Sequence, residues 1–415
     1  MKKNNALDSK CPSCGAQIIW DPALEKFSCE YCASKFSMDE LLAAQEKEKV
    51  SENSDELVSF KCSNCGAEIV SDVNTFSTFC VYCGSTAILK DKIKNDEKPD
   101  YVIPFKKTSD DAKSAYKELL KGKWLLPRKF RKAEMSEKIK GIYIPFWAYD
   151  ITADGDINFT GIDIEKWEDD EYEYEKREYY DVTVSGHYEY EKILCDASKF
   201  FSDDLMDSIS PFKLDELVKY NHAFLSGYLA DRYDVSKDES YKIAKERSKN
   251  SCIIVAKRKS PHDEEDYEGD SLSFNKKKTY HIYLPVYILN VKCKDKLYTF
   301  AMNGQTGKLV GNLPISTIKY VLSILTFFLL IFLVLWFIIY EFGFLNETTY
   351  WSISIFDIIV TIIYAFVIRI KYRSVKIDYY ALDYLNKDTL KLSKIKDSYI
   401  RSSTNRSRKL NSKRD

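Results

Sequence analysis

Histidine is scarce in this chain of 415 residues, which has only four copies. None of the four belongs to an H-E-x-x-H pair, and Ser185-Gly186 lacks the flanking glycine of a nucleophile elbow. The glycine-containing stretch 304–308 lacks the first glycine and the final serine or threonine of a phosphate-binding loop, so it favours a tight hairpin turn. These absences remove common signals of hydrolases and nucleotide-binding enzymes. We predict that the protein is not an enzyme.

The chain also lacks an overall positive charge. Its net charge is −1, and residues 369–415 hold 14 Lys or Arg against 5 Asp, so residues 1–368 sum to −10. An acidic remainder is a poor match for a protein whose main role is to bind nucleic acid. The start, MKKNNALDSK, has no apolar run behind it, and we therefore expect no cleavable signal peptide.

Charge is missing altogether from the run Val321–Tyr340. Twenty helical residues reach about 30 Å, the thickness of the hydrocarbon core of a bilayer. A second apolar run, Trp351–Ile368, contains one acid, Asp357, which we expect either to pair with another polar group or to lie near the outer interface. We predict a hairpin of two membrane-spanning helices, at 319–340 and 351–369, joined by an external link at 341–350.

The charges beside these spans predict their orientation. The link has two Glu and no Lys or Arg, whereas the segment after the second span is strongly basic. Because Lys and Arg stay on the cytoplasmic side, we expect a cell-membrane protein with both termini in the cytoplasm. The basic tail, 370–415, either lies on the inner leaflet and binds anionic lipid or is a disordered tail that fixes topology. Beyond Ser398 we expect disorder.

The cysteines of the N-terminal region form two matching sets. Each set has two C-x-x-C pairs with fourteen residues between them, and the second set repeats the first 51 positions later. Such spacing is typical of tetrahedral structural zinc, with an iron–sulfur or rubredoxin-like centre as the main competitor and disulfides a poor fit to a cytosolic N-terminus. We predict two zinc ions, held by Cys11, Cys14, Cys29, Cys32, Cys62, Cys65, Cys80 and Cys83.

The ribbons around these cysteines carry no basic face. Residues 10–36 hold three Lys against three acids, and 61–90 hold two Lys against two acids. Base-stacking grooves are also positively charged, so we expect the ribbon aromatics to fill small cores rather than to stack on bases. These aromatics are Trp20, Phe27, Tyr31, Phe76, Phe79 and Tyr82.

The middle of the chain is long enough for its own core. Helices are expected from Thr108 or Ser109 to about Lys121 and from Ser236 to about Lys249. Tyrosine-rich strands are expected at 142–151, 179–190 and 280–291, with proline inside the apolar runs indicating edge strands or bulges. The acidic stretch 163–181 predicts a solvated hairpin, with attraction of a basic partner as the alternative. Cys195, Cys252 and Cys293 are expected to be ordinary semi-buried thiols.

The predicted fold is therefore multidomain. Its order along the chain is zinc ribbon 1 at 1–36, a charged helical spacer at 37–58, zinc ribbon 2 at 59–90, a linker at 91–100, an irregular antiparallel α+β cytoplasmic domain at 101–314, the transmembrane helical hairpin, and the basic cytoplasmic tail at 370–415.

Several segments together resemble a bacterial protein family. They are the twin ribbons, GIYIPFWAYD, LSGYLADRYDV, LPVYILNV, the NGQTGKLVG turn and the terminal spans. The chain resembles the transcription-factor-B-type zinc-ribbon membrane proteins, sometimes labelled relatives of a primosomal replication-restart helicase. The resemblance implies a membrane component of envelope-stress operons that acts beside flotillin-like and phage-shock-protein-A-like partners. The helicase label does not transfer, because the chain has no nucleotide-binding loop.

Two functions remain open at the level of sequence. The first is a membrane adaptor that recruits cytoplasmic proteins through its ribbons and α+β domain. The second is a membrane-tethered nucleic-acid binder that uses its ribbons and basic tail, which a salt-dependent shift of labelled DNA or RNA would reveal.

Overall fold

The computed structural model describes most of the chain and divides it into two compact units. The first unit comprises Met1–Pro145, Ser198–Tyr233 and Tyr283–Ile377, and the second comprises Phe146–Ala197, Asp234–Ile282 and Asp378–Asp415. The described residues are 11–16, 18–47, 58–62, 66–71, 88–92, 98–128, 130, 139–225, 227–293, 296–342, 347–376 and 378–409.

The first unit begins with a small antiparallel sheet of three strands, β1 (Ile18–Asp21), β2 (Lys26–Cys29) and β3 (Lys35–Phe36). Helix α1 (Met38–Lys47) follows directly. Its start is a capping box: the Ser37 hydroxyl accepts from the Glu40 backbone N–H, and the Glu40 carboxylate accepts from the Ser37 N–H. A three-stranded sheet therefore lies where the first ribbon is expected, and the start of the expected helical spacer forms from local sequence.

The second ribbon region contributes three strands to the large sheet. They are β4 (Val58–Cys62), β5 (Glu68–Ser71) and β6 (Ile88–Lys92), with β4 between the other two and antiparallel to both. Strand β5 also pairs with β11 (Leu229–Asp231). These strands thus belong to a sheet built from distant parts of the sequence.

The large sheet is mixed. Its strand order is β10-β7-β13-β8-β11-β5-β4-β6, with β7 at Tyr101–Val102, β8 at Lys140–Glu168, β10 at Val218–Lys219 and β13 at Ser273–Cys293. Strand β11 runs parallel to β8, with Leu229 opposite Ile142, so the expected antiparallel arrangement is not complete. Pro145 lies inside β8, which has β13 on one side and β11 and then β9 on the other, so the expected edge position is wrong for this proline.

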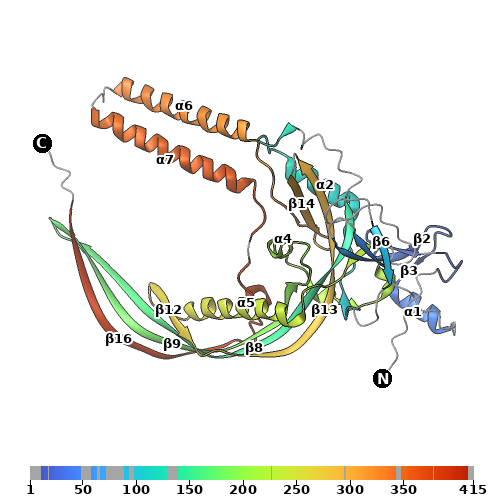
Figure 1. The fold of residues 1–415 in the computed structure, drawn as a ribbon. Helices are drawn as coiled ribbons and strands as arrows, with labels where there is room; N and C mark the ends of the chain where they lie inside the picture. The colour runs from blue at the N-terminus through green and yellow to red at the C-terminus, as the bar shows by residue number, and fades with distance from the viewer. Residues whose placement is uncertain are drawn as a thin grey trace. The chain divides into compact units, whose positions relative to one another are not determined.

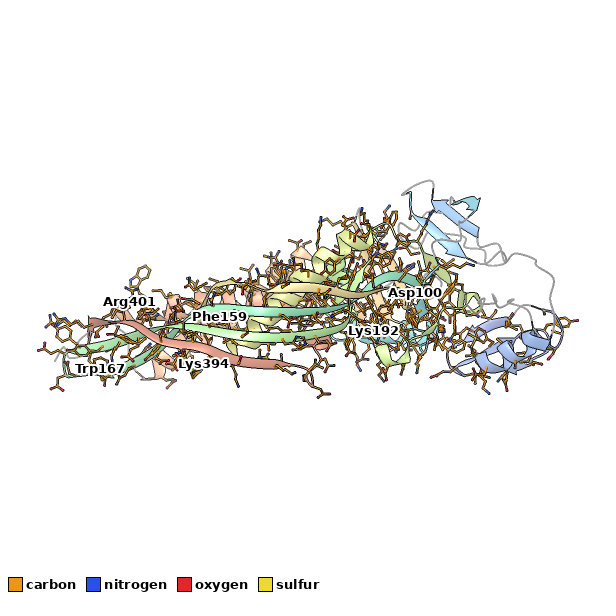
Figure 2. All side chains as sticks on the ribbon, turned by 90° about the horizontal axis from the view of Figure 1, so that it is seen from below. Asp100, Phe159, Trp167, Lys192, Lys394 and Arg401 are labelled. Carbon is orange, nitrogen blue, oxygen red and sulfur yellow. The ribbon has the colours of Figure 1, made fainter. Side chains whose placement is uncertain are left out.

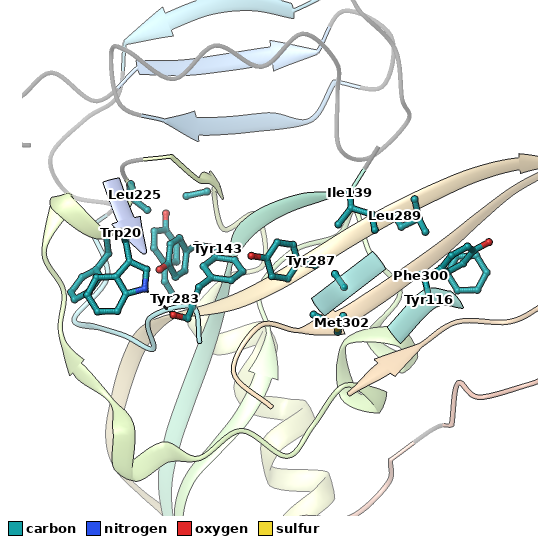
Figure 3. Packing of buried hydrophobic residues seen from close by; sticks show 14 of the residues in the cluster. Trp20, Tyr116, Ile139, Tyr143, Leu225, Tyr283, Tyr287, Leu289, Phe300 and Met302 are labelled. Atoms are coloured by element: carbon teal, nitrogen blue, oxygen red, sulfur yellow. Dashed lines mark hydrogen bonds between the residues drawn. The ribbon is translucent and has the colours of Figure 1, made fainter. Parts of the chain in front are cut away.

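The remaining elements of the first unit pack around an aromatic core (Figure 3). Helix α2 (Ser109–Leu120) is capped by Thr108 as predicted, and α4 covers Asp203–Ser208. Phe105 stacks on Tyr228 with ring centroids 4.1 Å apart and meets Tyr143 edge-on at 5.0 Å. Short 3₁₀ turns cover Leu214–Glu216 and His222–Leu225.

The predicted tight turn is confirmed between β14 (Lys296–Asn303) and β15 (Leu309–Val310). The buried Asn303 side chain accepts from the backbone N–H groups of Gln305 and Thr306, and Gly307 takes a positive φ of 84°. The residues that resemble a phosphate loop therefore close a hairpin.

The second unit is a sheet with the strand order β12-β8-β9-β16, in which every pair is antiparallel. It combines the later part of β8 with β9 (Tyr172–Asp196), β12 (Glu264–Asp270) and β16 (Lys391–Arg408). Helix α5 (Lys237–Lys257), capped by Ser236, extends eight residues beyond its predicted end, and a 3₁₀ turn covers Leu382–Tyr384. Helix α5 shares a core with the sheet that includes Tyr149, Phe159, Tyr188 and Tyr190.

The C-terminal region corrects one expectation. Disorder beyond Ser398 is wrong, because β16 pairs with β9 from Lys391 to Arg408 (Figures 1 and 2). The predicted hairpin at 163–181 is confirmed, and β16 is its third strand. The stretch 163–181 carries ten acids and three bases, whereas 391–408 carries six bases and one acid, so opposite charges accompany the backbone pairing.

Two apolar helices, α6 (Thr317–Phe342) and α7 (Glu347–Lys371), lie side by side (Figure 1). The most apolar 18-residue windows within Thr317–Ile338 and Trp351–Lys371 have mean hydropathies of 3.0 and 2.3, and only 6% and 11% of these windows are buried. The Phe327 and Tyr364 rings stack at 3.9 Å, and the Tyr364 hydroxyl lies 2.9 Å from the Ser323 hydroxyl. Both helices are long and apolar enough to cross a membrane.

Candidate metal centre

Four of the predicted cysteines meet at one point. The sulfur atoms of Cys11, Cys14, Cys29 and Cys32 all lie within 4.8 Å of one another. The closest approaches join the two pairs, at 3.5 Å from Cys11 to Cys32 and 3.6 Å from Cys14 to Cys29. A tetrahedron with metal–sulfur bonds of about 2.3 Å has edges of about 3.8 Å, so this cluster can hold a metal ion.

Two similar backbone turns place the sulfurs. Gly15 donates its N–H to the Cys11 carbonyl at 2.8 Å, and Ala33 donates to the Cys29 carbonyl at 2.9 Å. Both turn residues have positive φ, 73° at Gly15 and 59° at Ala33. Ala33 thus adopts the conformation for which glycine is the easier choice, at a small steric cost. The pairing of β1 with β2, which sets Ile18 opposite Cys29, brings the turns together.

The crowded thiols have divergent acidities. Hydrogen bonding with Ser34 lowers the pKa of Cys32 to about 6. The backbone contact with Ala16 by itself lowers the pKa of Cys14, but burial and hydrogen bonds with the three other thiols outweigh it and raise that pKa to about 12. The protons are therefore distributed unequally among adjacent sulfurs. A bound cation would replace them and release protons.

The ribbon is attached to the core of the first unit rather than hanging free of it. The Trp20 indole N–H donates to the Phe105 carbonyl at 2.8 Å. Phe224 packs against both ribbon aromatics, 5.2 Å from Trp20 and 5.4 Å from Phe27 between ring centroids. The expectation that these two aromatics fill a core is confirmed, whereas Tyr31 is 85% exposed.

The second cysteine set lies almost wholly outside the described residues. Cys62 ends β4, and its side chain is not described. Cys65, Cys80 and Cys83 are not among the described residues. The structure therefore brings together four of the eight predicted ligands. The second site remains a prediction.

The other cysteines are more buried than expected. Cys195, Cys252 and Cys293 are 1%, 0% and 8% exposed, and burial raises the pKa of the Cys252 thiol to about 12. Cys293 belongs to the apolar core of the first unit, and Cys195 and Cys252 belong to that of the second.

The sequence did not predict one group of polar side chains in the second unit. His262 lies between two carboxylates, those of Asp163 and Asp397, which are 99 and 135 residues away along the chain. No local spacing signals such a contact, because three separate segments of the second unit must fold before it forms. A simpler pair joins His187 to Asp154 at 2.5 Å.

Comparison with known proteins supplies a family. The uncharacterized protein YdjG of Bacillus subtilis is 30% identical over 311 residues, which cover 75% of this chain and 91% of YdjG. The chain belongs to the YdjG family. No protein-family model matches the chain, and no solved structure matches it. The relationship to YdjG covers most of both chains.

Proposed function

We propose that this protein is a membrane-anchored zinc-ribbon adaptor that recruits cytoplasmic proteins to the inner face of the bacterial membrane. The observation that carries the proposal is the combination, in one chain, of two exposed apolar helices with a four-cysteine cluster built into a folded unit. An anchor and a rigid module on the same polypeptide are the parts that recruitment needs.

The choice of zinc rests on the ligands. Four cysteines leave no open position for a substrate, and thiolates at C-x-x-C spacing suit a structural zinc ion. The repeated spacing at Cys62, Cys65, Cys80 and Cys83 supports a second ion of the same kind. Metal analysis of the purified protein separates zinc from iron.

The recruiting surface is best placed on the outer side of the first ribbon. Trp20 and Phe27 are buried in the core, whereas Tyr31, between Cys29 and Cys32, is 85% exposed and Leu24, in the turn between β1 and β2, is 44% exposed. Exposed aromatic and aliphatic side chains on a rigid turn are common anchors for a protein partner. The family resemblance points to flotillin-like or phage-shock-protein-A-like proteins as the first candidates.

Contact with anionic lipid is best placed at the end of α7 and directly after it. Residues 369–376 hold four Lys or Arg, two of them in the last turn of α7, and each basic residue near an anionic surface contributes about 1 kcal/mol. The bases of β16 instead lie beside the acidic strand β9. This assignment supports a cytoplasmic location for both ends of the chain.

Affinity purification from mildly solubilised membranes tests the adaptor function. The double variant Cys11→Ser, Cys14→Ser should lose bound proteins that the intact chain retains, while Cys252→Ser should retain them. Retention of the same proteins by the double variant would remove the first ribbon from recruitment. Salt-dependent binding of labelled DNA by the full chain, without a bound protein, would instead support the nucleic-acid alternative.

A further inference from the structure

Both ring nitrogens of His262 face a carboxylate. Nδ1 lies 2.9 Å from Asp163 Oδ1 on β8, and Nε2 lies 3.1 Å from Asp397 Oδ1 on β16. The His262 side chain is only 5% exposed, and its ring stacks on Tyr180 of β9 with centroids 4.5 Å apart. One imidazole therefore contacts three strands of the second unit, including β16, the last strand in the described part of the chain.

This geometry requires a particular protonation state. An ionised carboxylate only accepts hydrogen bonds, and a neutral imidazole has one N–H and one lone pair. With a neutral ring, one carboxylate would face a lone pair instead of a donor. Both contacts are satisfied together only when the ring is an imidazolium cation, which donates at both nitrogens.

The site is shaped to hold the ring in place. A Cβ added to Gly161 of β8 would lie 2.3 Å from Cδ2 of His262, so only glycine leaves room for the ring there. The neighbouring Asp263 carboxylate accepts from the Ile164 backbone N–H at 2.9 Å and fixes the loop that carries His262. The ring is thus confined between β8 and the Tyr180 ring.

The attached strand has few apolar contacts of its own. From 396 to 408, every residue of β16 except Ser403 is exposed, although the Asp397 side chain is only 22% exposed. Besides backbone pairing with β9, Leu392 packs against the core, and the Tyr399 ring lies 5.8 Å from the Tyr180 ring. Polar contacts add the Lys396–Asp181 pair, and Lys409, just after the strand, pairs with Glu168 at 3.1 Å. Figure 2 marks Lys394 and Arg401 on this strand.

We propose that His262 is an imidazolium clasp that fastens the C-terminal strand β16 to β8, so that attachment of this strand depends on pH. At pH values above the pKa of His262 the clasp opens, and the basic side chains of β16 become free for other contacts. The inference does not depend on the adaptor function or on bound metal.

The direction of the pH dependence follows from the groups around the ring. Burial by itself lowers the pKa of His262, but the carboxylates of Asp163 and Asp397 outweigh burial and raise it. The clasp therefore stabilises the attachment of β16 fully at pH values below the unfolded histidine pKa of about 6.5. This stabilisation is lost as pH rises through the raised pKa that His262 has in the folded protein.

The other charged and titratable groups that face the clasp keep their charge over the same pH range. Lys394 pairs with Asp397 at 2.6 Å and lowers the pKa of that carboxyl, so it stays ionised near neutral pH. On β9, Tyr180 donates to Glu178 at 3.1 Å, and that contact raises the pKa of the tyrosine. Within this set, only His262 changes charge near neutral pH.

Hydrogen exchange of the full chain in detergent micelles tests the clasp. The readout is the protection factor of residues 391–408, corrected for the intrinsic pH dependence of exchange, between about pH 6 and about pH 9. In the intact protein, protection of this segment should fall severalfold as pH rises. His262→Asn should have low protection throughout and no pH-dependent fall.

Two further variants separate the clasp from a general effect of pH. Gly161→Ala keeps every titratable group but displaces the ring, and it should also abolish the pH dependence. His187→Gln removes a second histidine–carboxylate pair, which joins β8 to β9, and should retain the pH dependence of the intact protein. Equal protection of the intact chain at both pH values, or unchanged pH dependence in His262→Asn, would overturn the proposal.

Discussion

The indole N–H of Trp20 donates a hydrogen bond to the backbone carbonyl of Phe105, at 2.8 Å and across 85 residues of sequence. Trp20 lies on β1 beside the cysteine cluster, and Phe105 lies in the aromatic core of the first unit. The turns that carry the four cysteines are therefore joined to the core of the first unit.

Replacing Trp20 by smaller residues should lower the free energy of unfolding by an amount that depends on what is removed. Trp20→Phe keeps an aromatic ring but removes the hydrogen bond, and should lower the free energy of unfolding by about 1 kcal/mol. Trp20→Ala also empties the space beside Phe27 and Phe224, and should lower it by about 3–5 kcal/mol. Urea unfolding in micelles, followed by circular dichroism, measures both. Equal effects of the two variants would contradict this account of the packing.

Metal content should follow the two cysteine sets independently. The intact protein should bind two zinc ions, and the double variant Cys11→Ser, Cys14→Ser should bind one, because two sulfurs cannot complete a tetrahedral site. Cys62→Ser with Cys65→Ser should likewise remove one ion. Elemental analysis of the purified chain measures the stoichiometry, with the buried Cys252→Ser as the matched control. Iron in place of zinc, or one ion in the intact chain, would be the contrary outcome.

Asp357 should be a cost to membrane insertion rather than a support. It is 0% exposed in α7, and neither carboxylate oxygen has a hydrogen-bond partner among the described residues. An Asp within a span disfavours insertion, by about 3 kcal/mol at the centre and less toward the interface. Asp357→Leu should therefore increase the inserted fraction of the second helix, measured by glycosylation mapping, while the exposed Ile359→Leu should leave it unchanged. Reduced insertion or lost protein recruitment in Asp357→Leu would show that the acid has a required partner.

Each ion pair along β16 should contribute little to the attachment of this strand, and the whole set should contribute more. The Lys396 and Asp181 side chains are 51% and 42% exposed, so Lys396→Gln should cost below about 1 kcal/mol. Raising the salt to about 1 M shortens the screening length to about 3 Å and should weaken the whole set of exposed pairs. Hydrogen exchange of residues 391–408 reports both effects. A loss of protection in Lys396→Gln as large as in His262→Asn would be inconsistent with a central role for the histidine.

Local sequence predicts several elements because their causes are local. Thr108 with Asp111 and Ser236 with Glu239 are capping contacts between residues three apart, so the starts of α2 and α5 can be inferred from sequence. The turn after Asn303 follows from residues within the turn itself. The end of α5 could not be inferred in this way, because Cys252, Val255 and Ala256 continue the helix by packing in a core shared with β8 and β9.

The basic tail illustrates the opposite case. Its composition predicts a segment that cannot bury an apolar core, and that much agrees with the exposed side chains of β16. Its strand pairing depends on β9, whose paired residues lie about 200 positions earlier in the chain. Charge complementarity with the stretch 163–181 becomes visible only when the two segments are adjacent.

By itself, the amino-acid sequence determined the cysteine spacing, the two apolar helices and the caps and turns, because each depends on residues within a few turns or strands of one another. Tertiary structure alone decided that Trp20 joins the ribbon to the core, that β11 runs parallel to β8, and that His262 lies between Asp163 and Asp397. The physical reason is that these contacts join segments far apart in sequence, whose meeting depends on packing of the folded units rather than on local preference.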